Sequence, residues 1–495
     1  MFFFPLLGAF ALGMIALVVN FFAGAANSFS YGIATALLIY GCCLVDRTTI
    51  RSVGLICLFA ALCTPLAADM QPGPDGGLYH FAHQRWIREH EIIFGFAHLH
   101  ARYGFSSFLE YINSLLWIGE AFKLLSYMSA LYFVCLLSFI YFAINSKNNF
   151  IRILALFIGI NLLIYDGYFI WKYGYADSAA GLTFALSILA GLYILVSETR
   201  ENECRASQLS AFFMLCAMAV ALKVSSILVA LWAVFVFATL LWRKQISTRR
   251  IPAILAFPAV FTLLWLLRGV ITTGCLLFPV SWTCLTVPWH AKQEAILYSD
   301  LVTAWARHPH TGRSSLEGWS WLTDYWLEAN ASFLIYLSLA AVVIVLLAAM
   351  AHRFFATTRL QPAIAFALVG VIAVSLILWF LKAPTDRFGI GIFLIAVPVI
   401  ALAIFGAPML RTGPHLRLLS FILVILLANG QGGFSIKGLS TFQMLTLPQT
   451  ELVAHPVFGV HGKNPNDFCW AAKDCVRSKN LPAPVTRSGY LFFEQ

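Results

Sequence analysis

The sequence predicts an all-α membrane protein, a polytopic bundle of transmembrane helices with loops and a small tail outside the bilayer. Of its 495 residues, 60% are hydrophobic and only 11% are charged, whereas a soluble domain covers its surface with far more charge. Apolar runs of about 20 residues, the length that crosses a bilayer core, recur from one end of the chain to the other. Lysines and arginines gather in the short connections between these runs, as they do in cytoplasmic loops of membrane proteins.

About thirteen of these runs are expected to span the membrane. The first has no positively charged segment before it, so we interpret it as a span and not as a cleaved signal peptide. Two short neighbouring runs, 208–222 and 226–242, are predicted as separate spans, with one long kinked element as the alternative. The expected spans cover roughly residues 3–23, 28–45, 52–68, 122–144, 150–166, 177–196, 208–222, 226–242, 251–270, 331–350, 361–381, 389–408 and 416–432.

The distribution of basic residues predicts which side of the membrane each connection faces. With thirteen spans and a cytoplasmic N-terminus, all six basic connections fall on the cytoplasmic side. The other side receives three long polar stretches, at about 69–121, 271–330 and 433–495. We therefore expect a transmembrane domain over 1–432 with two extracytoplasmic loops, and an extracytoplasmic, mostly irregular C-terminal tail over 433–495. The six connections carry Arg47/Arg51, Lys147/Arg152, Arg200/Arg205, Arg243/Lys244/Arg249/Arg250, Arg353/Arg359 and Arg411/Arg417.

The formal net charge of +10 is accounted for by these connections and does not indicate a nucleic-acid partner. Most of the 11 cysteines lie in apolar runs, where cysteine acts as a small apolar residue. Cys469 and Cys475 lie instead in the polar tail. If that tail faces an oxidising compartment, a local disulfide between them is expected.

The segment PGPDGGLYHFAHQRW, which begins at Pro72, holds the first candidate for chemistry. Its prolines and glycines break the chain just after the third predicted span, and they place Asp75 near the membrane–water boundary at the start of a helix over about 77–91. A carboxylate there can reach both water and a lipid headgroup, which suits a general base acting on an acceptor hydroxyl. The alternative is a helix N-cap with a solvated carboxylate.

The same loop contains four histidines, and Arg102 follows them. Imidazole is a common metal ligand, but the spacing of these histidines matches no strong zinc pattern. We therefore predict no metal site, although a divalent metal stays possible, and histidines that only form hydrogen bonds are the alternative. The four histidines are His80, His83, His98 and His100.

Ionisable residues near the ends of other spans fall on the same predicted side as Asp75. Arg268 lies in an apolar run without a nearby acidic residue, where it either serves a function, such as binding phosphate oxygens, or snorkels to the interface. Asp177 begins a span rich in small residues. An acid surrounded by cations would suit transfer from an anionic lipid-phosphate donor. The cations on this side are Arg102, Lys172, Lys223, Arg268 and Arg387.

The first loop resembles a motif of bacterial polytopic membrane proteins that are mostly uncharacterised and occur near surface-polysaccharide genes. In that family an Asp-x-Gly-Leu-Tyr-His run is followed by a Trp and by a Leu-His-x-Arg-x-x-x-x-Ser element. The stretch around Arg268, Gly274 and Pro279 is similar to a second family element, and Asp177 and the Cys469–Cys475 pair also fit. The matching positions in the loop are Asp75, Gly77, Leu78, Tyr79, His80, Trp86, Leu99, His100, Arg102 and Ser107.

This family looks like the GT-C superfamily of membrane glycosyltransferases. The resemblance implies a sugar transferase that uses a polyprenyl-phosphate donor at the outer face of the bacterial inner membrane, with a cell-surface glycan or lipid as acceptor. It implies Asp75 as the acidic residue that serves as the base or positions the acceptor. From the residues themselves we expect Asp177 as a second catalytic residue, which orients the acceptor or binds a metal. The residues expected to bind substrate are His80, Arg102, Lys172, Arg268 and Arg387. One departure is that the acidic loop follows the third predicted span here, whereas in most GT-C enzymes it follows the first.

Three other functions stay open at this point. A polysaccharide polymerase or ligase also has about a dozen spans and large outer loops, and would use a diphosphate-linked oligosaccharide. A lipid-linked sugar transporter or flippase is a second, although such folds often show internal repeats and the sequence has none. The third is a scaffold protein without activity in a polysaccharide export complex.

Overall fold

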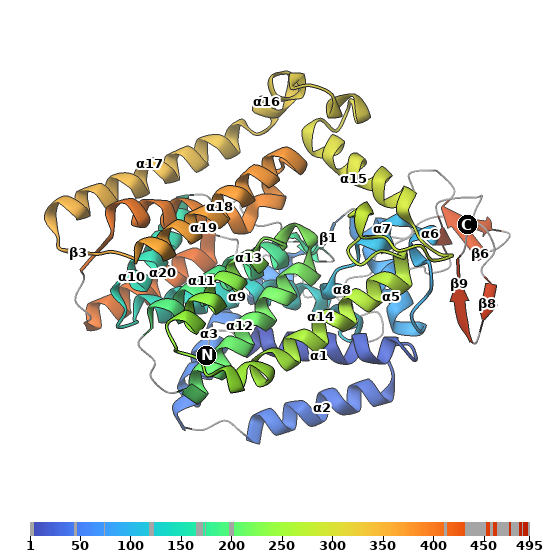
Figure 1. Cartoon of the computed structure of the whole chain (residues 1–495), viewed down its shortest axis with the longest axis horizontal. Coiled ribbons are helices and arrows are strands. Elements are labelled where there is room, and N and C mark those ends of the chain that lie inside the picture. The colour runs from blue at the N-terminus through green and yellow to red at the C-terminus, as the bar shows by residue number, and fades with distance from the viewer. Residues whose placement is uncertain are drawn as a thin grey trace.

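The computed structural model of the chain is a helical protein (Figure 1), which confirms the predicted all-α class. It describes residues 4–43, 47–73, 75–117, 123–164, 172–173, 175–197, 202–409, 413–430, 452–455, 459–462, 475–476, 485–487 and 489–493.

Eight stretches of the described chain are helical, long and apolar enough to cross a membrane, and five shorter apolar helices accompany them. Each of the thirteen predicted runs thus overlaps a helix. That more than eight of them span the membrane stays a prediction. The eight long stretches contain α9 (Lys123–Ile144), α11 (Asp177–Val196), α12 (Asn202–Leu222), α13 (Val229–Trp242), α14 (Ile251–Thr273), α17 (Ala331–Phe354), α18 (Pro362–Lys382) and α19 (Asp386–Phe405). The shorter helices are α1 (Phe4–Asn20), α2 (Ser28–Cys43), α3 (Arg47–Leu62), α10 (Asn149–Ile164) and α20 (Pro414–Gly430).

Two helix breaks show where local chemistry sets the boundaries. The predicted run 52–68 divides between α3 and a short helix α4 (Thr64–Asp69), because Pro65 cannot donate the backbone hydrogen bond that would continue α3. The run 208–242 divides at Lys223, where the backbone is extended before a 3-10 turn at Val224–Ser226. The 208–242 segment is therefore two helices and not one kinked element.

Helix α11 lies in the middle of the bundle. Its apolar window is 83% buried, whereas that of α17 is 22% buried and leaves an apolar surface exposed. Close contact with α19 depends on two glycines: a Cβ added at Gly391 would lie 2.2 Å from the backbone oxygen of Gly181. Small residues of this kind let two membrane helices approach closely, and here they bring the start of α19 beside the start of α11.

Described parts of the three long polar stretches lie at the same end of the molecule, where the short helices of the first stretch, one end of α15 and the C-terminal strands are neighbours (Figure 1). Short helices of the first stretch lie beside α15 (Lys292–Arg307) of the second, where Nδ1 of His98 lies 3.2 Å from Oε1 of Glu294. The backbone NH of Gly95 also donates to the oxygen of Ile271, in the last turn of α14, at 3.0 Å. The NH of Phe94 donates to the oxygen of Leu491, in the tail, at 2.9 Å. The short helices of the first stretch are η1 (Gly76–His80), α5 (Phe81–Glu89), α6 (Phe96–Leu99), α7 (Ala101–Phe105) and α8 (Phe108–Ser114).

Several basic connections also contact one another, away from these loops. Strand β3 (Thr357–Thr358) pairs antiparallel with β4 (Ala407–Pro408), and the Asn149 amide donates to the oxygen of Pro408 at 2.6 Å. The Arg243 guanidinium donates to the Gln361 side chain. The basic connections therefore lie beside other basic connections.

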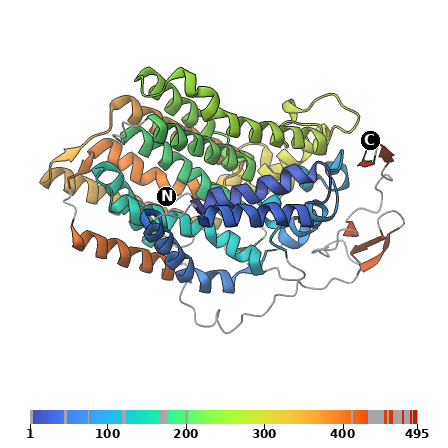
Figure 2. The ribbon, with the colours of Figure 1, turned by 90° about the horizontal axis from the view of Figure 1, so that it is seen from below.

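The described parts of the tail are small strands (Figure 2) where the sequence predicts mostly irregular structure. Strands β5 (Leu452–His455), β6 (Gly459–Gly462) and β7 (Cys475–Val476) form one sheet in that order. Strands β8 (Val485–Arg487) and β9 (Tyr490–Phe492) form an antiparallel hairpin. The predicted Cys469–Cys475 disulfide cannot be placed, because Cys469 lies outside the described residues.

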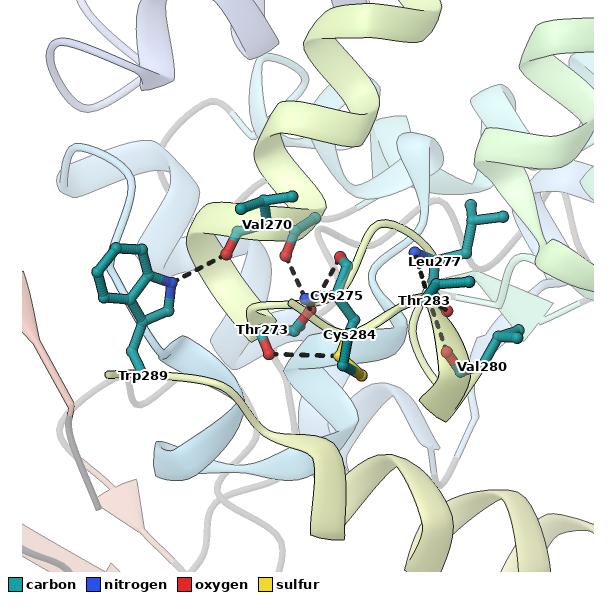
Figure 3. The surroundings of a disulfide bond; sticks show 9 residues. Val270, Thr273, Cys275, Leu277, Val280, Thr283, Cys284 and Trp289 are labelled. Carbon is teal, nitrogen blue, oxygen red and sulfur yellow. Dashed lines mark hydrogen bonds between the residues drawn. A yellow bond between two sulfur atoms is a disulfide. The ribbon is translucent and has the colours of Figure 1, made fainter. Parts of the chain in front are cut away.

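A disulfide between Cys275 and Cys284 closes the turn after α14 (Figure 3). The two cysteines face each other across an isolated antiparallel bridge, and the Cys275 NH donates to the Thr273 hydroxyl at 3.0 Å. The Trp289 indole NH donates to the oxygen of Val270 at 2.9 Å, which ties the start of the following loop back to α14. Sequence analysis did not single out this pair.

The side chain that follows β9 anchors the tail to the first loop. Phe493 is 1% exposed and packs against a cluster from that loop which includes Trp86, Phe96 and Tyr103. We predict that Phe493→Ala destabilises the protein by about 3–5 kcal/mol, because it leaves a cavity in a packed cluster. The matched control is Val485→Ala in the same hairpin, since Val485 is 46% exposed. Equal melting temperatures of the two purified variants would contradict this anchoring role.

Candidate functional site

Asp75 is held in place by contacts between the first loop and the segment before α11. Strand β1 (Gln71–Pro72) pairs in parallel with β2 (Lys172–Tyr173). The backbone NH of Asp75 then donates to the Tyr175 hydroxyl at 3.2 Å. Gly73 allows this approach, because a Cβ there would lie 2.3 Å from the Tyr175 ring.

The Asp75 carboxylate contacts two arginines from distant parts of the chain. Its Oδ1 lies 3.5 Å from Nη1 of Arg102, and its Oδ2 lies 3.3 Å from Nη1 of Arg387. Asp75 precedes η1 but makes no side-chain capping hydrogen bond, so the N-cap alternative does not describe its contacts. The Asp75 side chain is 20% exposed and both contacts are long, which leaves its oxygens able to exchange partners when a ligand arrives.

Asp177 forms a second ion pair, with Lys223. Asp177 is the first residue of α11, and Lys223 occupies the break after α12, where its ammonium also lies 3.6 Å from the centre of the Phe388 ring. Burial lowers the pKa of Lys223, and the charge of Asp177 only partly offsets this shift.

Arg387 connects the two ion pairs. Besides its contact with Asp75, it lines one hollow together with Asp177 and Lys223. We call Asp75, Arg102, Asp177, Lys223 and Arg387 the Asp75–Asp177 cluster; it has three cations for two carboxylates. The other residues that line the hollow are Ser225 and Ser226, after α12, and small or apolar residues of α11 and α19, which include Ala180, Gly181, Phe184, Gly391 and Ile392.

A buried carboxylate that sequence analysis did not identify lies next to this cluster. Oε1 of Glu110 lies 2.7 Å from Nδ1 of His80, and Oε2 lies 2.9 Å from Nδ1 of His83. The backbone NH of Ser107 donates to Oε2 at 2.9 Å, and the Ser106 hydroxyl donates to it at 3.2 Å. We call Glu110, His80 and His83 the Glu110 cluster.

The charge state of the Glu110 cluster follows from these contacts. Burial by itself would raise the pKa of Glu110, but His83 and His80 outweigh it and hold that pKa well below its usual value. Burial lowers the pKa of His83, although Glu110 opposes the shift. We infer an ionised Glu110 that accepts hydrogen bonds.

Tyr79 lies between the two clusters. Its ring centre lies 5.1 Å from the Arg102 guanidinium and 4.1 Å from the centre of the His80 ring. Burial raises the pKa of Tyr79, and the negative charge of Asp75 raises it further. Tyr79 is therefore a neutral phenol that separates the Glu110 cluster from Arg102.

Arg268 contacts neither carboxylate of the Asp75–Asp177 cluster. It is 3% exposed, and its Nε and Nη2 donate to the Tyr111 hydroxyl and the Tyr103 oxygen, each at 3.3 Å. The structure thus brings Asp75, Arg102 and Arg387 together and joins Asp177 to Lys223, while Arg268 lines another hollow. The side chain of Lys172 lies outside the described residues, although its backbone pairs with Gln71.

One sequence signal could have identified Glu110. Ser107-x-x-Glu110 before an apolar run is the pattern of a capping box, and both of its reciprocal hydrogen bonds are present at the start of α8. The pattern predicts the cap but not the two histidines, because they come from the π-helix η1 and from α5. Within the described residues, no group of three or more His, Cys, Asp or Glu side chains is arranged to hold a metal ion.

The ion pair of Asp177 with Lys223 predicts that substitutions at the two positions have coupled effects on the free energy of unfolding. Lys223→Met should destabilise the protein by about 3 kcal/mol, because it leaves the buried Asp177 carboxylate without its counter-charge. Adding Asp177→Asn should restore part of that loss. Thermal unfolding of the wild type, both single variants and the double variant in one detergent measures the coupling. Strictly additive effects of the two substitutions would contradict it.

A family model described as "Domain of unknown function (DUF8201)" matches residues 1–394. No curated protein and no solved structure matches the chain. The matched region contains the Asp75–Asp177 cluster, the Glu110 cluster and Arg268, whereas the tail lies beyond it. The chain therefore belongs to the DUF8201 family.

Proposed function

We propose that this protein is a membrane glycosyltransferase of GT-C type, which transfers a sugar from a polyprenyl-phosphate donor to a cell-surface glycan or lipid acceptor. The observation that carries the proposal is the Asp75–Asp177 cluster: a partly exposed carboxylate between two arginines, beside a hollow that is lined by Lys223, Arg387 and Asp177 and by small or apolar side chains. A lipid phosphate has the matching chemistry, an anionic head on a hydrocarbon chain.

In the proposed reaction Asp75 accepts the proton of the acceptor hydroxyl, and that oxygen attacks the anomeric carbon of the donor sugar. The bond from the anomeric carbon to the phosphate oxygen breaks, and the lipid phosphate leaves with the electron pair. Arg387 and Lys223 stabilise the negative charge on the departing phosphate; these residues take the place of Arg268, which does not contact the cluster. One displacement of this kind inverts the anomeric configuration.

The donor part of this proposal is tested by binding alone. Purified protein in detergent is titrated with polyprenyl monophosphate and with the uncharged polyprenol, and the melting temperature is recorded. We expect the phosphate to stabilise the wild type and the alcohol to have little effect. Arg387→Gln should weaken phosphate binding by roughly 10–100-fold, because it removes a charge-assisted contact. Equal stabilisation by phosphate and alcohol would contradict a phosphate site.

We also propose that the protein lies in the bacterial inner membrane with its N-terminus in the cytoplasm and the three polar stretches outside. The positive-inside rule supports this orientation. The Cys275–Cys284 disulfide supports it as well, because disulfides persist in oxidising compartments.

Two matched serine substitutions test the orientation in intact cells. Ser247 and Ser320 are both exposed, the first beside the basic connection after α13 and the second in the 271–330 stretch. A membrane-impermeant maleimide should label Ser320→Cys in intact cells and should label Ser247→Cys only after lysis. The opposite pattern would show that the orientation is reversed.

A further inference from the structure

Helix α15, in the second polar stretch, exposes its large apolar side chains. Four of them are between 38% and 46% exposed, namely Ile296, Leu297, Leu301 and Trp305. The residues that α15 buries are smaller, namely Ala295, Thr303, Ala304 and Ala306. On the surface of a soluble domain the large apolar side chains of a helix turn towards the protein. We call the four exposed side chains the α15 apolar face; a patch of this kind indicates an apolar neighbour outside the chain.

Helix α15 is too short and too charged to be a membrane span. Its 16 residues make a helix about 24 Å long, whereas the hydrocarbon core of a bilayer is about 30 Å thick. It also contains the charged side chains of Lys292, Glu294, Asp300 and Arg307. Helix α15 can therefore contact lipid along its length only if it lies along the membrane surface.

Both ends of α15 are joined to the ends of long apolar helices. The NH of Ala291, which precedes α15, donates at 2.8 Å to the oxygen of Thr273, the last residue of α14. The guanidinium of Arg307, the last residue of α15, donates at 3.0 Å to the oxygen of Leu381, in the last turn of α18. Helices α14 and α18 are both long and apolar enough to cross a membrane. Helix α15 therefore runs between two points at which candidate spans end.

The opposite side of α15 packs on the polar stretches. Ala295 lies in one cluster with Ala97 of the first stretch and with Phe278 of the turn that the Cys275–Cys284 disulfide closes. Leu297 lies on the other side of the helix from Ala295, because two residues of an α-helix turn the chain by about 200°. The α15 apolar face therefore points away from the loops against which α15 packs.

Exposed tryptophans lie on both sides of α15 in the sequence. Trp282, in the turn after α14, is 84% exposed, and Trp319, after α15, is 56% exposed. The Trp319 ring stacks on that of Phe380, near the end of α18, with 6.2 Å between their centres. Tryptophan is enriched where a membrane meets water, because its ring is apolar and its NH is polar. The two indoles thus fit an interface at the level of the ends of α14 and α18.

We propose that α15 lies along the surface of the bilayer, on the side of the three polar stretches, with the α15 apolar face against the acyl chains of phospholipids. A helix in the plane of the interface buries such a face while its charged residues stay in the headgroup layer. Trp305 also lies against Arg387, whose guanidinium carbon is 4.8 Å from the centre of its ring. The Asp75–Asp177 cluster therefore lies next to the headgroup layer. This inference does not depend on the proposed transfer reaction.

Photocrosslinking of the full-length protein in vesicles tests this contact. p-Benzoylphenylalanine replaces Leu297 or Leu301 in separate variants, which are reconstituted into vesicles of radiolabelled phosphatidylethanolamine and phosphatidylglycerol. After irradiation, the lipid label that is covalently attached to the protein is counted. The control positions are Val342, exposed on the candidate span α17, and Val485, exposed in the β8–β9 hairpin. We expect both α15 positions to give lipid adducts at the level of Val342 and several-fold above Val485.

Melting temperatures of the variants show whether each one folds, and if one α15 variant does not, the other is judged by the same comparison. Adducts at the α15 positions that do not exceed those at Val485, while Val342 is labelled, would overturn the proposal. A crosslinked dimer in place of a lipid adduct would also overturn it, since the α15 apolar face would then contact a second copy of the chain.

Discussion

Replacing Asp75 with asparagine is expected to reduce sugar transfer by at least about a hundredfold, the usual contribution of a general base. The amide has nearly the shape of the carboxylate but cannot accept the proton of the acceptor hydroxyl. Arg102 and Arg387 lose a counter-charge in this variant, but their contacts with Asp75 are long and partly exposed. The melting temperature of Asp75→Asn should therefore stay close to that of the wild type.

The measurement is the turnover of a radiolabelled donor by purified wild type and Asp75→Asn at equal concentrations. Arg85→Gln is a suitable control, since Arg85 is an exposed charge in the same loop that pairs with Glu89, and it should keep wild-type turnover. If Asp75→Asn also keeps wild-type turnover, Asp75 is not the base.

Replacing Glu110 with alanine should lower the stability of the first loop by about 3 kcal/mol. The change removes the acceptor of His80 and of the Ser107 NH and the carboxylate that lies against His83, and buried polar groups without partners are costly. Glu89→Ala is the matched control, because Glu89 is 36% exposed and its pair with Arg85 contributes little. Melting temperatures that fall equally in the two variants would contradict a central role for Glu110.

The Glu110 cluster also predicts how stability depends on pH. The pKa of Glu110 is lower in the folded protein than in the unfolded chain, so folding favours its charged form. This contribution is fully present above the ordinary pKa of a glutamate, 4.5, and is lost as the pH falls towards the folded value. The wild type should lose stability steadily below about pH 4.5, whereas Glu110→Gln should lose less over the same range. Identical acid profiles of wild type and Glu110→Gln would contradict this account.

Local patterns in the sequence predicted the helices well. Every predicted run coincides with a helix, because hydrophobic length is a property of a short segment of chain. The boundary at Pro65 was missed, although proline gives a local signal there. The sidedness of the basic connections predicted that the three polar stretches share one side, and the contacts of Phe94 with Leu491 and of Gly95 with Ile271 join described residues of all three.

The candidate site was predicted less completely, because its contacts join distant residues. Sidedness placed Asp75 and Arg387 on one face, and they are in contact across 312 positions of sequence. The same argument grouped Arg268 with them, yet Arg268 lines another hollow. Sidedness predicts at which end of the bundle a residue lies, but it does not predict which helices are neighbours there. Glu110 was missed because its role depends on His80 and His83, which lie about one helical turn apart on neighbouring elements.

The most direct test of the proposed transfer reaction compares two classes of donor in one assay. Purified wild type and Asp75→Asn are incubated with radiolabelled polyprenyl-monophosphate sugars and with a polyprenyl-diphosphate oligosaccharide, and the release of label to water or to an added acceptor is measured. The account predicts that the wild type releases sugar from a monophosphate donor and that Asp75→Asn does not. Release only from the diphosphate donor, or release that does not depend on Asp75, would contradict it.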